Sequence, residues 1–172
     1  LLGLGALGVA ASERLRDAGF ETIGWSRSAK TLPGMEALSG EDGLSELLER
    51  SDILVCLVPL TVETRGLLNG GRIRQMKQGA SIINFARGAV IIGDDLIKAL
   101  DDGHLSHAVL DVFETEPLDQ NSVFWNHPNV TVLPHISAPT NRKTAAKIVA
   151  ANIRRWRETG QLPATVDMTR GY

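Results

Sequence analysis

The chain alternates short apolar runs with stretches in which apolar residues recur every three or four positions. The runs predict strands, at residues 21–25, 53–58, 81–85, 108–112 and 130–133. The amphipathic stretches predict helices, at residues 9–18, 44–49, 70–77, 94–100 and 140–159. This alternation is typical of an α/β fold with an open, doubly wound parallel sheet.

Glycines and polar residues mark where these elements begin and end. Gly19, Gly103 and Gly160 are predicted to end helices, and Asp94 to cap the helix over 94–100. The polar segments 26–42 and 114–129 are predicted to be loops, and long loops in a compact domain often carry function. The last predicted helix presents one apolar face, made of Ala145, Ile148, Val149, Asn152, Ile153 and Trp156.

Composition narrows the class of protein. The chain has 172 residues, of which 43% are hydrophobic and 22% charged, as in globular domains. Its net charge of −2 does not favour binding to a nucleic acid or to an anionic membrane. No apolar run approaches the ~20 residues of a membrane span. The single cysteine, Cys56, lies in the apolar run 53–58 and is expected to be buried and inert. A cytoplasmic protein is the expectation.

The segment Gly3-Leu4-Gly5-Ala6-Leu7-Gly8 matches the pattern G-x-G-x-x-G, with apolar residues before it and a predicted helix after it. The first glycine permits a tight turn, the second lets a pyrophosphate approach the backbone, and the third lets the helix pack on the strand. We therefore expect Gly3, Gly5, Ala6, Leu7 and Gly8 to bind a dinucleotide. An ordinary glycine-rich strand–helix turn is the alternative.

The end of the next strand favours one dinucleotide. Enzymes that prefer NAD usually have an acid there, about 20 residues on, to hold the ribose 2′-hydroxyl. Here the chain reads Ser26-Arg27-Ser28 with Lys30 nearby, and the first acid is Glu36. Arg27 can pair with a 2′-phosphate and Ser26 can hydrogen-bond it, so Ser26, Arg27 and Lys30 are expected at the cofactor and NADP is predicted over NAD. A solvated loop with ordinary basic residues is the alternative.

Three further segments follow predicted strands and each carries one chemical group. They hold Arg87, Glu116 and His135. In an open α/β sheet such segments meet beyond the carboxyl ends of the strands. A guanidinium can orient a 2-oxo acid, an imidazolium can protonate the developing alkoxide, and a carboxylate behind the imidazole favours its charged form. A surface arginine and a simple turn at Glu116-Pro117 are the alternatives.

The remaining histidines and the aromatic residues of the second loop are less informative. His104 and His107 are expected on the surface and His127 in a structural role. Phe124 and Trp125 either pack under the loop that carries Glu116 or contact a partner subunit.

Together these segments resemble the D-isomer-specific 2-hydroxyacid dehydrogenase family along nearly the whole chain. The matching pieces are Val58-Pro59-Leu60-Thr61 with Glu63-Thr64, Ala86-Arg87-Gly88, Asp111-Val112-Phe113 with Glu116-Pro117, and Pro134-His135. Within the family, the chain most resembles the glyoxylate/hydroxypyruvate reductase branch. The segments that carry this resemblance are Trp25-Ser26-Arg27, the Pro134-His135 loop and Val166-Asp167 with Arg170-Gly171-Tyr172.

The resemblance implies a role for each of these residues. It implies that Arg87 orients the substrate, that His135 is the general acid and base, and that Glu116 is the partner of His135. It further implies that Asp111 holds the nicotinamide carboxamide. The cofactor crevice would be lined by Val58, Pro59, Thr64, Phe85 and Ala86. Ser137 is also placed at the cofactor, although this chain has Ile136-Ser137-Ala138-Pro139 where many members have a Gly-containing stretch.

The resemblance also implies the setting of the domain. Residues 1–139 would form a Rossmann-type NAD(P)-binding domain, and 140–172 a helix and tail that return toward a substrate domain of on the order of 100 residues, missing upstream. Family members are usually homodimers joined through the cofactor domain, and no metal is expected. The implied reaction is NADPH-dependent reduction of glyoxylate or hydroxypyruvate. The alternatives are another D-2-hydroxyacid dehydrogenase, such as the phosphoglycerate type, or a nicotinamide-binding corepressor-like module.

Overall fold

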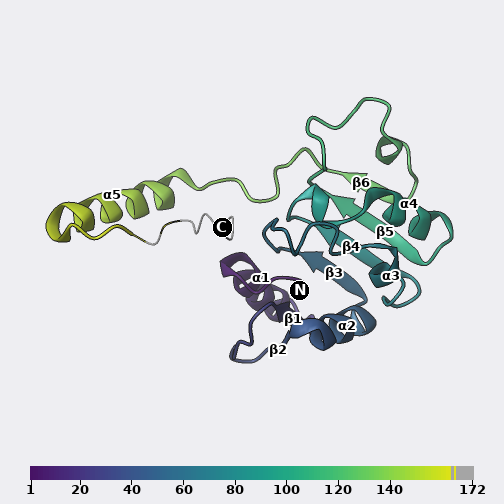
Figure 1. Ribbon diagram of the computed structural model, residues 1–172, viewed down its shortest axis with the longest axis horizontal. Coiled ribbons are helices and arrows are strands. Elements are labelled where there is room, and N and C mark those ends of the chain that lie inside the picture. The colour runs from purple at the N-terminus through teal and green to yellow at the C-terminus, as the bar shows by residue number, and fades with distance from the viewer. Residues whose placement is uncertain (164, 166–172) are drawn as a thin grey trace. The chain divides into compact units, whose positions relative to one another are not determined.

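The computed structural model of the protein describes residues 1–163 and 165, and its centre is a parallel β-sheet (Figure 1). Leu2 bridges Trp25 on one side and Cys56 on the other, so residues 1–3 join two strand groups into one sheet. The order is therefore β2-β1-(1–3)-β3-β4-β5-β6, which is that of a doubly wound sheet. The strands are β1 (Ile23–Ser26), β2 (Glu36–Ser39), β3 (Ile53–Cys56), β4 (Ala80–Asn84), β5 (Leu105–Leu110) and β6 (Val130–Val132).

Helices connect the strands and lie on opposite faces of the sheet. The order of the strands reverses at residues 1–3, and right-handed crossovers then place α1 on one face and α2, α3 and α4 on the other. The helices are α1 (Ala6–Asp17), α2 (Gly40–Arg50), α3 (Gly70–Ile73), α4 (Gly93–Asp101) and α5 (Arg142–Thr159), with short 3-10 helices η1 (Gly88–Val90) and η2 (Val123–Trp125).

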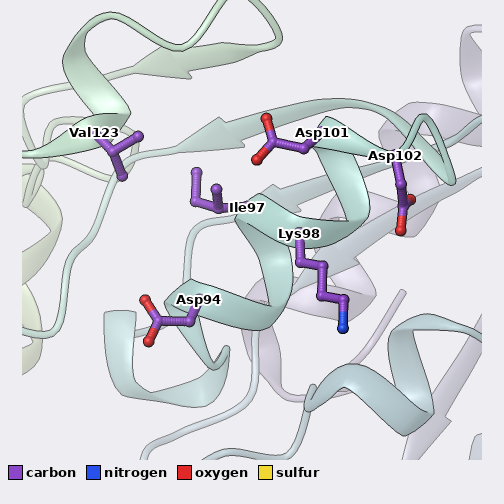
Figure 2. Close-up of a pocket in the computed structure, with 6 residues that line it drawn as sticks. All are labelled: Asp94, Ile97, Lys98, Asp101, Asp102 and Val123. Atoms are coloured by element: carbon purple, nitrogen blue, oxygen red, sulfur yellow. The ribbon is translucent and has the colours of Figure 1, made fainter.

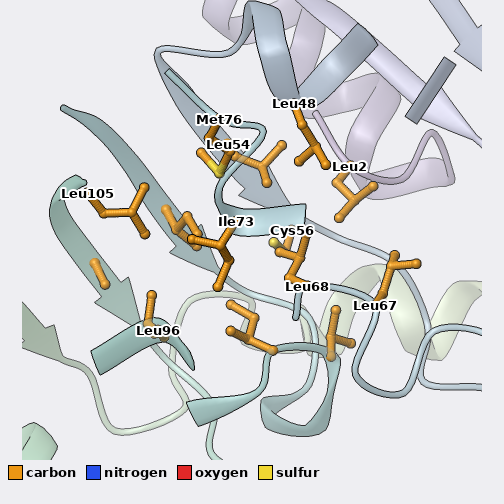
Figure 3. Close-up of a cluster of buried hydrophobic side chains, with 14 of the residues drawn as sticks. Leu2, Leu48, Leu54, Cys56, Leu67, Leu68, Ile73, Met76, Leu96 and Leu105 are labelled. Atoms are coloured by element: carbon orange, nitrogen blue, oxygen red, sulfur yellow. The ribbon is translucent and has the colours of Figure 1, made fainter. Parts of the chain in front are cut away.

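One hydrophobic cluster holds this arrangement together (Figure 3). Alternate residues of β3, β4 and β5 face it, and α2, α3 and α4 cover it with leucines, Ile73 and Ala99. Cys56 is fully buried within it, and this burial raises the pKa of the thiol to about 12, so the expectation of an inert cysteine is confirmed. The buried residues that these three strands contribute are Leu54, Cys56, Ala80, Ile82, Leu105, Ala108 and Leu110.

The prediction that residues 26–42 are a loop is wrong in its second half. Residues Glu36–Ser39 form β2, which pairs with β1 in parallel register, and Gly40 begins α2. The sequence Glu-Ala-Leu-Ser has low strand propensity, and the strand is stabilised by its neighbours instead. The indole of Trp25, for example, donates to the Gly40 carbonyl at 2.8 Å.

Three other local predictions are also wrong. The residue that caps α4 is Ile92, whereas Asp94 lies in the first turn, where a carboxylate still interacts well with the helix dipole. His104 is buried rather than exposed, and its Nε2 lies 3.0 Å from the Ile73 carbonyl. The strand predicted at 108–112 begins three residues earlier, at Leu105.

The side chain of His127 is only 6% exposed, which fits a structural role. Its Nε2 lies 3.2 Å from Asp101 at the end of α4, and its Nδ1 accepts the Asn129 N–H at 3.1 Å. The histidine therefore fixes the end of the loop 114–129 to a helix.

The chain contacts divide it into two units, residues 1–135 and 136–172, each described by itself. In the second unit, Asn141 caps α5 through the N–H groups of Lys143 and Thr144, and Gly160 ends the helix with φ +67°, as predicted. The large apolar residues of α5, Ile148, Val149, Ile153 and Trp156, are more than half exposed. No helix in the described part of the chain is long and apolar enough to cross a membrane. The motif residues Val166, Asp167, Arg170, Gly171 and Tyr172 lie outside the described residues.

Truncation of Ile82 tests the core. Its side chain is 0% exposed at the centre of β4, so Ile82→Ala should lower the free energy of unfolding by about 2–5 kcal/mol in urea denaturation. Val62 is 93% exposed, and Val62→Ala should change the free energy of unfolding by less than about 0.5 kcal/mol. Equal effects of the two substitutions would contradict this assignment of the core.

Candidate active site

The parallel sheet brings the predicted site residues to one edge. Gly3 follows the central strand residues, and Val58, Arg87, Asp111 and His135 follow β3, β4, β5 and β6. All of these strands run in the same direction, so their carboxyl ends lie at the same edge. The expected convergence of the loops follows from this topology.

The glycine-rich turn is shaped by close backbone contacts. Gly3 has φ +116°, and a Cβ there would lie 2.8 Å from the Leu57 carbonyl carbon. A Cβ on Gly8 would lie 1.9 Å from the Gly3 oxygen, so α1 packs directly on the strand end. A Cβ on Gly5, in contrast, would meet no described atom within 4 Å.

This turn fits a pyrophosphate. Gly5 occupies the cap position of α1 and has no side chain to accept the first N–H groups of the helix, and the first turn of α1 contains no acid. The free N–H groups and the positive end of the helix dipole therefore face the open space beside Gly5. Ala6 and Leu7 form this first turn, and the Leu7 side chain is exposed.

The basic loop after β1 lies against the same turn. Ser26 is buried and donates its hydroxyl to the Ser28 carbonyl at 2.7 Å, whereas Arg27 is exposed. The ammonium of Lys30 donates to the Leu4 carbonyl at 2.6 Å, within the glycine-rich turn. A hydrogen bond from Thr61 holds the pKa of Glu63 below its usual range, and the positive charge of Arg27 acts in the same direction.

The segment after β3 is held by its own threonines. The Thr64 hydroxyl donates to the Pro59 carbonyl at 2.6 Å and accepts the Thr61 N–H at 2.7 Å. Val58 is buried beneath this loop. The hydroxyl of Thr64 thus fixes the shape of the segment that the family resemblance places along the cofactor crevice.

Asn84 positions the arginine turn, a role the sequence analysis missed. Asn84 ends β4 and is 1% exposed. Its side chain accepts the Ala86 N–H at 3.0 Å and donates to the Arg87 carbonyl at 3.1 Å, so both ends of its amide hold the turn through Phe85. The signal in the sequence is a polar residue at a strand position that alternation predicts to be buried.

Gly88 brings this turn against the loop that carries Glu116. A Cβ on Gly88 would lie 1.9 Å from the Phe113 carbonyl carbon and 2.2 Å from the Glu114 nitrogen. Only a glycine permits this backbone approach. The guanidinium of Arg87 donates to the Ala86 carbonyl at 2.7 Å, and its charge acts on Glu116.

Glu116 and His135 form a hydrogen-bonded pair. Nδ1 of His135 lies 2.8 Å from one carboxylate oxygen of Glu116, and the other oxygen accepts the Phe113 N–H at 2.9 Å. Because a carboxylate only accepts, Nδ1 carries the proton in this pair, and Nε2 is the ring nitrogen that does not contact Glu116. His135 has φ +55°, a conformation that residues other than glycine rarely adopt outside functional sites.

The surroundings of Glu116 set its acidity. The hydrogen bond from His135 is the largest cause that holds the pKa of Glu116 below its usual range, followed by the Phe113 N–H. The charges of His135 and Arg87 act in the same direction. Glu116 is therefore ionised at neutral pH.

The other candidates take different positions. Asp111 is buried directly after β5. Phe124 packs on the ring of Phe113, with centroids 5.8 Å apart, which fits the alternative that it packs under the loop of Glu116. Trp125 is half exposed, and its indole donates to the Asp119 carbonyl at 2.8 Å. Ser137 belongs to the second unit.

A surface pocket of about 420 Å³ lies on α4 and η2 and contains none of the predicted site residues (Figure 2). Of its carboxylates, Asp101 lies against His127 and Asp102 pairs with Arg74. No group of His, Cys, Asp and Glu in the described part of the chain could hold a metal ion. The carboxyl edge of the sheet therefore remains the candidate site.

Comparisons with known proteins agree with this geometry. A model of the family "D-isomer specific 2-hydroxyacid dehydrogenase, NAD binding domain" matches residues 1–137. The chain is 43% identical over its whole length to the glyoxylate/hydroxypyruvate reductase A of Serratia proteamaculans. It spans 55% of the length of that relative, about half.

Solved structures are also similar. The D-isomer specific 2-hydroxyacid dehydrogenase of Xanthobacter autotrophicus Py2, in complex with NADPH and MES, has a TM-score of 0.94 and 44% identity, over 99% of this chain and 71% of that one. The NADPH-dependent glyoxylate/hydroxypyruvate reductase of Sinorhizobium meliloti, in complex with NADP and sulfate, has a TM-score of 0.93 and 38% identity, over 99% and 55% of the two chains.

The lowered pKa of Glu116 gives a test of the pair. In His135→Gln the imidazole is lost, so the pKa of Glu116 should rise toward the ordinary glutamate value, as followed by a carbon-detected NMR titration of its carboxyl group. His107→Gln removes an imidazole that contacts Thr131 and should leave the titration unchanged.

The sign of the effect on stability follows from the same shift. The pKa is lower in the folded protein than in the unfolded chain, so the ionised Glu116 stabilises the fold above the ordinary glutamate pKa. This stabilisation should be lost as the pH falls through the lowered value. A Glu116 that titrates identically with and without His135 would show that the pair does not form in solution.

Proposed function

The chain belongs to the D-isomer-specific 2-hydroxyacid dehydrogenase family, and we propose that it is the cofactor domain of an NADPH-dependent reductase of small 2-oxo acids, with glyoxylate and hydroxypyruvate as substrates. In this proposal residues 1–139 form the dinucleotide-binding domain. The protein acts as a homodimer, which rests on the family resemblance, and in the cytoplasm, which the composition of the chain favours.

One observation carries the proposal. The His135–Glu116 pair and the Arg87 turn lie at the same sheet edge as the glycine-rich turn, and Gly88 holds the Arg87 turn against the loop of Glu116. An acid with a fixed orientation, a cation for the substrate and a dinucleotide turn are the groups that such a reduction needs. The named relatives from Serratia and Sinorhizobium support the choice of substrates.

The residues near Arg27 support NADPH over NADH. No acid occurs between Ser26 and Glu36, so no carboxylate in this loop would repel a 2′-phosphate. Arg27 is exposed at the end of β1. The Xanthobacter and Sinorhizobium structures are complexes with NADPH and NADP, which agrees with this choice.

In the reaction a 2-oxo acid, NADPH and a proton give a 2-hydroxy acid and NADP⁺. When bound, NADPH supplies the hydride for the keto carbon. Arg87 orients the substrate carboxylate and stabilises negative charge on the keto oxygen. His135 gives this oxygen its proton from Nε2, while Glu116 holds Nδ1 and favours the imidazolium. Asp111 would hold the nicotinamide carboxamide.

Replacement of His135 separates chemistry from cofactor binding. In the full-length protein, His135→Ala should lower kcat for glyoxylate by about 100-fold or more, since a general acid contributes on that order. The Kd for NADPH, measured by calorimetry, should change by less than about threefold, a difference of under 1 kcal/mol. His107→Ala is the control and should leave both values unchanged. A parallel loss of turnover and binding would contradict the role of His135.

Charge reversal at Arg27 tests the cofactor. Arg27→Asp removes a cation and adds a repulsive charge, so the Kd for NADPH should rise by about 100-fold while that for NADH changes little. Arg14 is an exposed arginine of α1 that pairs with Asp17, and Arg14→Asp makes the same change of charge as a control. If the preference for NADPH survives in Arg27→Asp, another group binds the 2′-phosphate.

A further inference from the structure

Two contacts fix the loop after Arg27. At one point the Lys30 ammonium donates to the Leu4 carbonyl at 2.6 Å. Further along, the guanidinium of Arg16, on α1, donates to the Gly34 carbonyl at 2.6 Å and to the Pro33 carbonyl at 3.3 Å. The first contact reaches the glycine-rich turn itself, whereas the second reaches a later turn of the loop.

The Leu4 carbonyl lies in the glycine-rich turn that leads into α1. Leu4 lies between Gly3, whose φ is +116°, and Gly5, which caps α1. Its orientation therefore sets the direction of the peptide planes that lead into the helix. A carbonyl oxygen is the negative end of a peptide dipole, and it would oppose a pyrophosphate at this helix terminus unless a donor held it.

The Lys30 ammonium is suited to this position. It has three N–H donors, and the contact with Leu4 uses one of them. Its charge compensates the carbonyl dipole and adds positive potential at the end of α1, where the dinucleotide phosphates would bind.

We propose that Lys30 is a positioning residue that holds the glycine-rich turn, through the Leu4 carbonyl, in the shape that accepts the pyrophosphate of either dinucleotide. This inference rests on the proposed function. It separates two roles within one loop: Arg27 discriminates NADPH from NADH, and Lys30 sets the affinity for both.

The test compares Lys30→Met, Lys30→Arg and Arg16→Met in the full-length protein. Methionine retains the apolar stem of Lys30 without the charge, arginine can donate to the same carbonyl, and Arg16→Met releases the loop only at its later turn. Calorimetry gives the Kd for NADPH and for NADH. Amide hydrogen exchange of residues 4–8, followed by NMR without cofactor, reports on the turn directly, and thermal unfolding reports whether each variant is folded.

Lys30→Met should weaken NADPH and NADH by the same factor, about tenfold, and should speed exchange in residues 4–8. Lys30→Arg should recover most of the affinity, and Arg16→Met should leave NADH affinity and the exchange of residues 4–8 unchanged. A loss confined to NADPH, with unchanged exchange, would make Lys30 a ligand of the 2′-phosphate and overturn the proposal, as would no change at all. If the wild-type protein binds neither dinucleotide, the proposed function itself fails. Separately, unchanged exchange in Lys30→Met would show that the hydrogen bond from Lys30 to the Leu4 carbonyl does not hold the turn.

Discussion

The parallel pairing of residues 1–3 with two strands at once is the constraint on which the rest of the structure depends. Leu2 accepts from Leu57 and donates to Val55 on one side, and Gly3 donates to Trp25 on the other. This strand is where the order of the sheet reverses, so the first turn of the molecule lies at the crevice between its two halves. The carboxyl ends of the neighbouring strands then have to meet beside it.

Three glycines convert this topology into a site. Gly3 and Gly8 allow α1 to sit on the strand end, and Gly88 allows the arginine turn to touch the backbone that leads to Glu116. In each case the space for a Cβ is occupied by backbone atoms, which cannot move aside as a flexible side chain could. The spacing between the dinucleotide turn, Arg87 and the His135–Glu116 pair is therefore set by main-chain contacts.

Much of this could be predicted from sequence because it depends on local patterns. Apolar periodicity gave the order of most elements, and strand order alone implied that Arg87, Glu116 and His135 would converge. What could not be predicted depends on contacts distant in the chain. β2 exists because β1 offers a paired edge, and His104 is buried because Ile73 offers a carbonyl. The contact between Lys30 and Leu4 spans 26 residues and has no local signature.

The two members of the His135–Glu116 pair are held in different ways. Glu116 accepts the N–H of Phe113, three residues earlier in the chain, at one oxygen and lies against His135 at the other, so one local and one distant contact hold it. His135 is held by that carboxylate and by a backbone with φ +55°, which only surrounding structure can maintain. The carboxylate therefore acts first as an anchor: it fixes the tautomer and the direction of the imidazole, and the stabilisation of its positive charge follows from that geometry.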